Sequence, residues 1–98
     1  MCGIFGVALG TESGFDRSST ERLMDNLFRL SESRGKEASG VALNTDDAIL
    51  VAKYAIPASE MIRRDEYRRL YQQAFSGNGH RTNGKSQHPT CIIGHSRW

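Results

Sequence analysis

Hydrophobic and small residues occupy both sets of alternate positions in the first segment of the chain, residues 2–9. One set is Cys2, Ile4, Gly6 and Ala8, and the other is Gly3, Phe5, Val7 and Leu9. Because successive side chains of a strand point to opposite faces, this pattern predicts a strand that is covered on both sides, as in a layered fold. The glycines would allow another backbone, or a ligand, to approach closely near the terminus.

The next segment has the period of an amphipathic helix. Ser18 followed by Glu21 has the spacing of a capping box, which predicts that the helix begins there. The apolar stripe behind this cap consists of Leu23, Met24, Leu27, Phe28 and Leu30. Gly35 stands where such a helix would end. We expect a helix of about four turns that packs on a sheet.

Two further strands and a second helical region follow. Residues 40–44 and 48–55 predict an antiparallel pair, joined by a turn at residues 45–47. Pro57 ends the strand character. Residues 58–75 then predict a helix in two pieces, whose apolar side contains Ile62, Tyr67, Leu70, Tyr71 and Ala74.

The last quarter of the chain changes character twice. Residues 76–90 are rich in glycine, asparagine and histidine, which predicts a long loop that is either functional or disordered. Residues 91–93 are apolar again and indicate a final strand, followed by Gly94-His95-Ser96-Arg97-Trp98. The mixture of elements predicts an α+β fold.

Length and charge limit the class of protein. The chain has 98 residues, which suits one small domain, and a net charge of +2. This charge is too small to indicate a nucleic acid or an anionic membrane as a partner. No apolar run approaches the roughly 20 residues that span a bilayer, and the amino terminus lacks the basic region of a secretory signal. We therefore expect a cytoplasmic protein.

The second helical region carries four arginines, Arg63, Arg64, Arg68 and Arg69. They could form a phosphate-binding patch, but Asp65 and Glu66 lie among them. We favour a solvated helix face.

Two cysteines, Cys2 and Cys91, are typical of a reducing compartment in which thiols stay free. A zinc site can be drawn from these cysteines with His95 and His88. The spacing Cys91-x3-His95 has no paired Cys-x2-Cys partner, so we expect neither a metal nor a cofactor.

Cys2 directly follows the initiator methionine. Removal of Met1 would place a thiol and a free α-amine on one residue. An α-amine has a reference pKa of about 7.7–8.0, so part of it is neutral at pH 7 and can accept the thiol proton. The alternative is that Cys2 is a small buried residue of the first strand.

Three segments resemble one enzyme family when they are taken together. They are Met-Cys-Gly-Ile-Phe-Gly at residues 1–6, Ser-Arg-Gly-Lys-Glu-Ala-Ser-Gly at 33–40, and Ile-Gly-His-Ser-Arg-Trp at 93–98. Their order and spacing resemble the class II glutamine amidotransferases, which are N-terminal-nucleophile hydrolases. The nearest branch is the one that aminates sugar phosphates, with glucosamine-6-phosphate synthase as its example. The resemblance implies an αββα sandwich, of which residues 1–98 would be the first half of the glutaminase domain.

The resemblance also implies roles for individual residues. Cys2 matches the catalytic nucleophile, which attacks the side-chain amide of glutamine and forms a γ-glutamyl thioester. Arg97 matches the arginine that binds the α-carboxylate of glutamine, and Trp98 matches the adjacent wall of the pocket. A guanidinium holds a carboxylate in a bidentate grip, which would aim the amide at the thiol. If the resemblance is set aside, the alternative for Arg97 is an ordinary surface ion pair.

The middle segment matches the supporting residues of that site. Arg34 matches an arginine near the nucleophile, although it would otherwise be read as a helix C-terminal charge. Gly35, Ser39 and Gly40 match the rest of the same turn. His95 lies in the last motif, and no proton-transfer role is assigned to it.

Parts of the family pattern have no counterpart here. The asparagine–glycine pair that binds the oxyanion and the acidic group for the substrate α-amine are not matched, since Asn78-Gly79 and Asn83-Gly84 come too early. Lys36-Glu37-Ala38 also departs from the usual turn. We expect residues 1–98 alone to be inactive, and the complete protein to bind glutamine and pass ammonia to a downstream acceptor or synthase domain, as a monomer or a homo-oligomer.

A second hypothesis is a non-catalytic interaction module that binds a partner chain. It predicts exposed strand edges and uncovered apolar faces.

Overall fold

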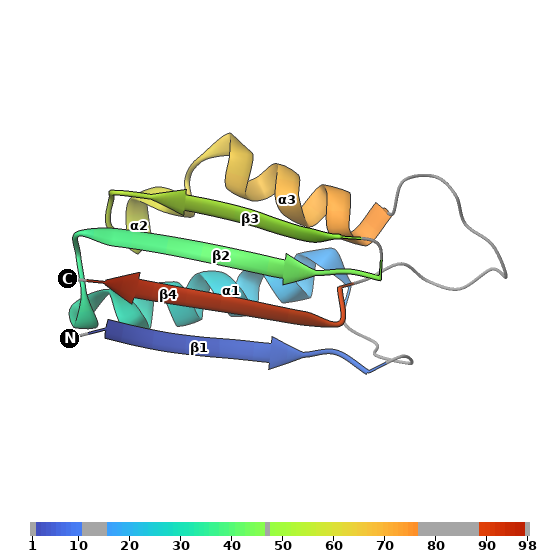
Figure 1. Cartoon of the computed structure of the whole chain (residues 1–98), viewed down its shortest axis with the longest axis horizontal. Helices are drawn as coiled ribbons and strands as arrows, with labels where there is room; N and C mark the ends of the chain where they lie inside the picture. Colours follow the sequence, from blue (N-terminus) through green and yellow to red (C-terminus); the bar gives the residue numbers. More distant parts are fainter. Residues whose placement is uncertain (1, 11–15, 47, 77–88, 98) are drawn as a thin grey trace, which may run out of the picture.

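The structure is a mixed α+β unit built on a four-stranded antiparallel sheet (Figure 1). It is a computed structural model that describes residues 2–10, 16–46, 48–76 and 89–97. The elements are β1 (Cys2–Ala8), α1 (Arg17–Ser31), the 3-10 helix η1 (Glu32–Arg34), β2 (Ala38–Asn44), β3 (Ile49–Tyr54), α2 (Ala58–Met61), α3 (Asp65–Ser76) and β4 (Cys91–Arg97). The strand order is β1-β4-β2-β3, so β1 and β3 are the edges. The predicted α+β class is confirmed.

The amino-terminal end of α1 differs from its prediction. The helix is capped by Asp16, whose side chain accepts a hydrogen bond from the backbone N–H of Ser19 at 2.8 Å. This bond lowers the pKa of the Asp16 carboxyl. The predicted start at Ser18 is wrong by two residues, because Asp16 is an equally good cap and Glu21 is engaged elsewhere.

The predicted β2–β3 hairpin is confirmed, although β2 begins two residues before the predicted 40 and β3 is one residue shorter at each end than the predicted 48–55. Residue 47 of the predicted turn lies outside the described residues. The two strands are antiparallel, with Asn44 opposite Ile49, and the backbone N–H of Thr45 donates to the carbonyl of Ala48 at 2.8 Å. The division of the following helical region into α2 and α3 is confirmed as well. Of the predicted loop, residues 77–88 lie outside the described residues.

The strand β4 lies in the middle of the sheet and pairs with both β1 and β2. It runs well beyond the apolar residues 91–93, to Arg97. The reason is that Gly94, His95 and Ser96 all have partners on both sides, which the apolar run alone could not indicate. This central position brings the last motif of the chain beside the first.

The helices cover one face of the sheet and make the core there. Phe28, Tyr67 and Tyr71 are completely buried and form a series of edge-to-face ring contacts with Phe5. Ring centroids lie 4.8 Å apart for Phe5–Phe28 and 5.0 Å for Tyr67–Tyr71. Below the first pair of rings lies Gly94, where a Cβ would come within 2.5 Å of Phe5. Such contacts add to the stabilisation from apolar burial.

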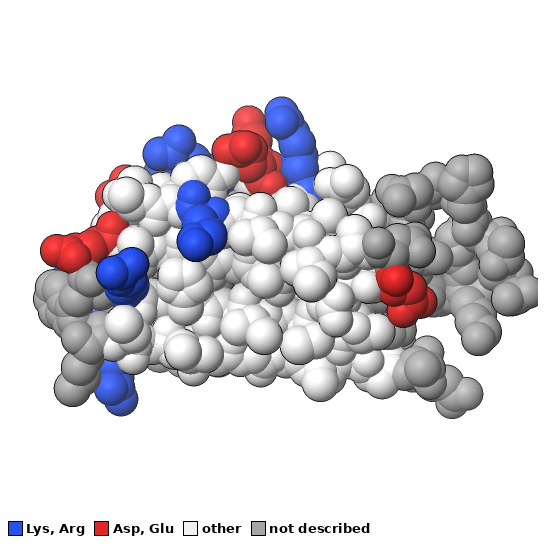
Figure 2. Space-filling view, in the orientation of Figure 1, with Lys and Arg blue, Asp and Glu red and all other residues white. Residues whose placement is uncertain are grey.

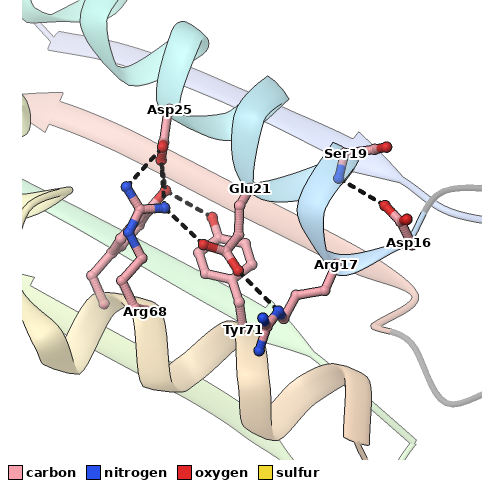
Figure 3. A network of polar contacts seen from close by, with 8 residues as sticks. Asp16, Arg17, Ser19, Glu21, Asp25, Arg68 and Tyr71 are labelled. Atoms are coloured by element: carbon pink, nitrogen blue, oxygen red, sulfur yellow. Dashed lines mark hydrogen bonds and ion pairs between the residues drawn. The ribbon is translucent and has the colours of Figure 1, made fainter.

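A polar network joins α1 to α3 at the edge of this core (Figure 3). The hydroxyl of Tyr67 donates to Asp25 Oδ1 at 2.9 Å, and Arg68 Nη2 donates to Asp25 Oδ2 at 2.8 Å. Arg68 Nη1 also reaches Glu21 Oε1 at 2.7 Å. Burial raises the pKa of the Tyr67 phenol, so it stays a donor. The prediction of a solvated face is therefore wrong for Arg68, while Arg63, Arg64 and Arg69 are exposed.

The other face of the sheet has no helix on it, and we call it the open face (Figure 1). Its exposed apolar side chains include Ile4 at 78%, Ile49 at 65%, Val51 at 53% and Ile93 at 48%. In Figure 2, uncharged residues cover most of this face, lysine or arginine side chains lie toward one end, and acidic side chains are visible at both ends. The prediction that β1 is covered on both sides is wrong for the described structure, because its second apolar face points to the open side.

None of the helices in the described parts of the chain is long and apolar enough to cross a membrane.

Candidate functional site

Cys2 and Arg97 lie directly opposite each other at one end of the open face. They are register partners in the antiparallel pair of β1 and β4, and both are exposed. Partners of this kind point to the same face, with Cβ atoms about 4.5–5.5 Å apart. The first and last motifs of the chain therefore meet at a thiol and a guanidinium.

The turn that follows η1 holds the end of β4 in place. A Cβ on Gly35 would lie 2.2 Å from the carbonyl carbon of Arg97, so the two backbones touch where only glycine fits. The backbone N–H of Glu37 donates to the carbonyl oxygen of Arg97 at 2.9 Å. Gly35 is thus the residue that allows the middle motif to position Arg97.

His95 lies on the same face, two residues before Arg97, and its ring extends over Gly40. A Cβ on Gly40 would be 2.5 Å from His95 Nε2 and 3.2 Å from Lys53 Cγ. Burial lowers the pKa of the His95 imidazole, and the nearby charges of Lys53 and Arg97 lower it further. Gly40 therefore provides the space in which a histidine and a lysine converge.

Arg34 approaches β1 from the helix side. Its Cβ lies 3.2 Å from the position of a Cβ on Gly3, whose side of β1 faces α1. Cys2 and Arg34 both line a groove of about 360 Å³ along the edge of β1, together with Leu30 and Ser31 of α1. Cys2 therefore lies between this groove and its strand partner Arg97.

Ser39 is not brought to Cys2. It is 1% exposed, lies on the helix-covered face and donates its hydroxyl to the carbonyl oxygen of Ile56 at 2.9 Å. Its cross-strand neighbour Ser96 is buried too and shares a hydrogen bond of 2.8 Å with Ser31. Ser96 thereby joins β4 to the end of α1, and Ser39 joins β2 to the connection between β3 and α2. Trp98 and Met1 lie outside the described residues.

The zinc site considered from the sequence is not assembled. Cys2 pairs with Arg97, whereas Cys91 pairs with Ala8 at the opposite end of the same two strands. Six residues of strand separate the two thiols by roughly 20 Å, too far to share an ion or a disulfide. In the described ranges no three His, Cys, Asp or Glu residues gather where they could hold a metal ion. The structure does not describe His88.

Lys53 is the residue of this region that sequence reasoning missed. In the sequence, Lys53 is distinguished only as a single lysine in an apolar strand. The register of β3 on β2 places it opposite Gly40. The combination of a lone charge in a strand and a small residue in the next strand could have indicated it.

Comparisons with known proteins found no matching family model, no matching curated protein and no matching solved structure.

Proposed function

We propose that residues 1–98 are the first half of a class II glutamine amidotransferase domain with the αββα N-terminal-nucleophile fold. After removal of Met1, Cys2 is the nucleophile that cleaves the side-chain amide of glutamine. The observation that carries the proposal is the pairing of Cys2 with Arg97 across β1 and β4. The first and last motifs stand at opposite ends of the sequence, and the function requires them to be neighbours in space. The pairing of β1 with β4 makes them neighbours.

The geometry supports the binding of a free amino acid. An arginine at the end of β4 can bind the α-carboxylate through paired charge-assisted hydrogen bonds, each worth about 1.5–3 kcal/mol when well formed. Glutamine extends from that carboxylate by a short chain to its amide. A thiol on the next strand is within reach of the amide carbon, because the two side chains leave the same face of the sheet.

The proposed reaction has two half-reactions. The Cys2 sulfur attacks the amide carbon of glutamine, the α-amine of Cys2 accepts the thiol proton, and that proton leaves with the nitrogen as ammonia. A water molecule then attacks the γ-glutamyl thioester, which releases glutamate and restores the thiol. Backbone or side-chain donors for the oxyanion are not identified in the described residues, and the loss of one such donor typically slows this chemistry by a factor on the order of 10²–10³.

The uncovered face of the sheet also favours this fold. In an αββα sandwich a second sheet packs on the first, about 10 Å away, and a first sheet seen alone would present an apolar face. The open face has that character at Ile4, Ile93 and Val51. The ammonia acceptor in the complete protein is proposed to be a sugar phosphate or a related amino-sugar precursor, by resemblance alone.

A single-turnover experiment tests the proposal. The complete protein, of which residues 1–98 are proposed to be the first part, is prepared without Met1 and incubated with isotopically labelled L-glutamine, and intact mass and released ammonia are measured. We expect a γ-glutamyl adduct on Cys2 that hydroxylamine removes, together with ammonia, in the parent and in Cys91→Ala but not in Cys2→Ala. Ammonia release that Cys2→Ala leaves unchanged would contradict the assignment.

A non-catalytic interaction module is the second candidate, favoured by the exposed apolar side chains and the two free strand edges, β1 and β3. It predicts association that is unaffected by Cys2→Ala and no reaction with glutamine. Intact mass and sedimentation of the parent and of Cys2→Ala distinguish the candidates.

A further inference from the structure

The end of the open face holds a second group of polar residues, one row of the sheet away from Cys2 and Arg97. This row runs from Ile4 on β1 through His95 on β4 and Gly40 on β2 to Lys53 on β3. Because Gly40 has no side chain, the His95 ring and the Lys53 side chain approach the same point above its backbone. We call this arrangement the Gly40 shelf.

The shelf carries the positive charge of Lys53, and the described strand positions around it on the open face hold no acidic residue. The open-face positions of β1 to β4 in the described structure contain neither aspartate nor glutamate. Lys53 and Arg97 are absent from the ion pairs of the described residues, which join Arg17 and Arg68 to Glu21 and Asp25. The charges of Lys53 and Arg97 both act on the His95 ring between them in the register, and an anion bound beside that ring would offset them.

The surroundings of the shelf would strengthen such a contact. Val51 and Ile93 flank it along the strands, and Ile4 closes the row on the side of β1. An ion pair beside apolar groups is less screened than one in open water. Burial and the charges of Lys53 and Arg97 all oppose protonation of the His95 ring, and they lower its pKa.

We propose that Lys53 and His95, with the backbone of Gly40 as the floor, bind an oxyanion, which is a carboxylate or phosphate group carried by a small molecule. The ammonium of Lys53 supplies the charge, and the His95 ring supplies a hydrogen bond from Nε2. The shelf adjoins the proposed nucleophile by one row of the sheet, but its lysine lies three strands from Cys2 in the sheet order. It does not require that Cys2 react with glutamine.

Nuclear magnetic resonance of the His95 ring tests the shelf in the 98-residue chain. His80 and His88 are replaced by glutamine, which leaves His95 as the single histidine signal. Inorganic phosphate and acetate are titrated separately at constant ionic strength. We expect a saturable change at His95, and the anion with the tighter binding identifies the phosphate or the carboxylate as the preferred group.

Variants decide whether the shelf is responsible. Lys53→Met is expected to weaken binding about threefold to fivefold, the weight of one exposed charge contact. Arg69→Met removes an equal charge from the helix side and is expected to leave binding unchanged. Gly40→Ala, which forces the His95 ring to move, is expected to abolish the change.

Two results would overturn the proposal. One is a response that rises linearly with anion concentration, which indicates an adventitious ion only. The other is equal weakening by Lys53→Met and Arg69→Met, which indicates an effect of net charge. Since Cys2→Ala is expected to bind the anions normally, failure here is independent of failure of the glutaminase assignment.

Discussion

The two faces of the sheet contrast in packing and in chemistry. On the helix-covered face, Ile92 and Leu43 are completely buried and neighbouring serines bond to one another or to the backbone. On the open face, Ile4 and Ile93 are exposed, and a thiol, a histidine and two cations lie at one end. The contrast teaches that stability and the candidate chemistry come from alternate residues of the same strands, so they can be changed separately.

Adjacent isoleucines in β4 give the sharpest test of this contrast. Ile92 is fully buried, whereas Ile93 is 48% exposed on the other face. Ile92→Ala is expected to lower the free energy of unfolding by about 2–5 kcal/mol, because it leaves a cavity. Ile93→Ala is expected to cost about 1 kcal/mol or less, the range of strand propensity. Urea denaturation measures both, and equal losses would mean that the open face is packed in solution.

The next largest effect is expected where the middle motif touches β4. Gly35→Ala places a methyl group 2.2 Å from the backbone of Arg97, so one of the two segments must move. We expect a loss of about 1–3 kcal/mol, typical of overpacking, and a displaced Arg97. Gly10→Ala is the control, since a Cβ there has open space around it. Denaturation curves that coincide for the two variants would contradict the claim that a glycine is required at position 35.

The polar network between α1 and α3 lies on the helix-covered side, and we expect the free energy of unfolding to depend on Arg68. Arg68→Met removes hydrogen bonds to Asp25 and Glu21, and leaves the largely buried Asp25 carboxylate without its cation. Because Arg68 is 38% exposed, we expect a loss of about 1–3 kcal/mol rather than the full cost of a buried pair. Arg69→Met, one residue on and exposed, should be nearly neutral. Thermal or urea unfolding of the two variants compares them directly.

The smallest expected effect is a pH dependence from the open face. The folded state disfavours the charged form of His95, and the unfolded chain binds the proton near its ordinary pKa of 6.5. The stabilisation from a neutral His95 is therefore present above pH 6.5 and is lost as the pH falls through the lower folded pKa. The groups that face this ring are Lys53 from β3, Gly40 from β2, Ile4 from β1 and Arg97 from its own strand.

His95→Gln should flatten this part of the stability profile, and Lys53→Met should reduce it because one repelling charge is gone. Unfolding by urea at closely spaced pH values below 6.5 measures the slope. A slope that neither variant changes would assign the pH dependence to other groups.

The sequence predicted elements better than it predicted contacts. Periodicity located the hairpin and the two-piece helical region, since each depends on residues that are near one another in the chain. Two good caps, Asp16 and Ser18, compete within one turn, and propensity alone does not choose between them. The pairing of Arg68 with Asp25 depends on how α3 docks on α1, which no local pattern specifies.

The candidate site divides in the same way. Its motif residues were predicted from the sequence, but the meeting of Cys2 with Arg97 follows from the central place of β4 in the sheet. Lys53 was missed because its approach to His95 requires the register of three strands. The alternating apolar pattern of residues 2–9 indicates two buried faces and cannot indicate what covers the second.

The central claim is a glutamine site built from Cys2 and Arg97. The most direct test is the labelling of Cys2 by an electrophilic analogue of glutamine, followed by intact-mass and peptide analysis. Cys91, unbridged like Cys2, is the internal control on the same face. We predict that the complete protein without Met1 gains one label at Cys2, that L-glutamine prevents this labelling and D-glutamine does not, and that Arg97→Met abolishes the protection. Equal labelling of Cys2 and Cys91, with no protection by L-glutamine, would contradict a glutamine site built from Cys2 and Arg97.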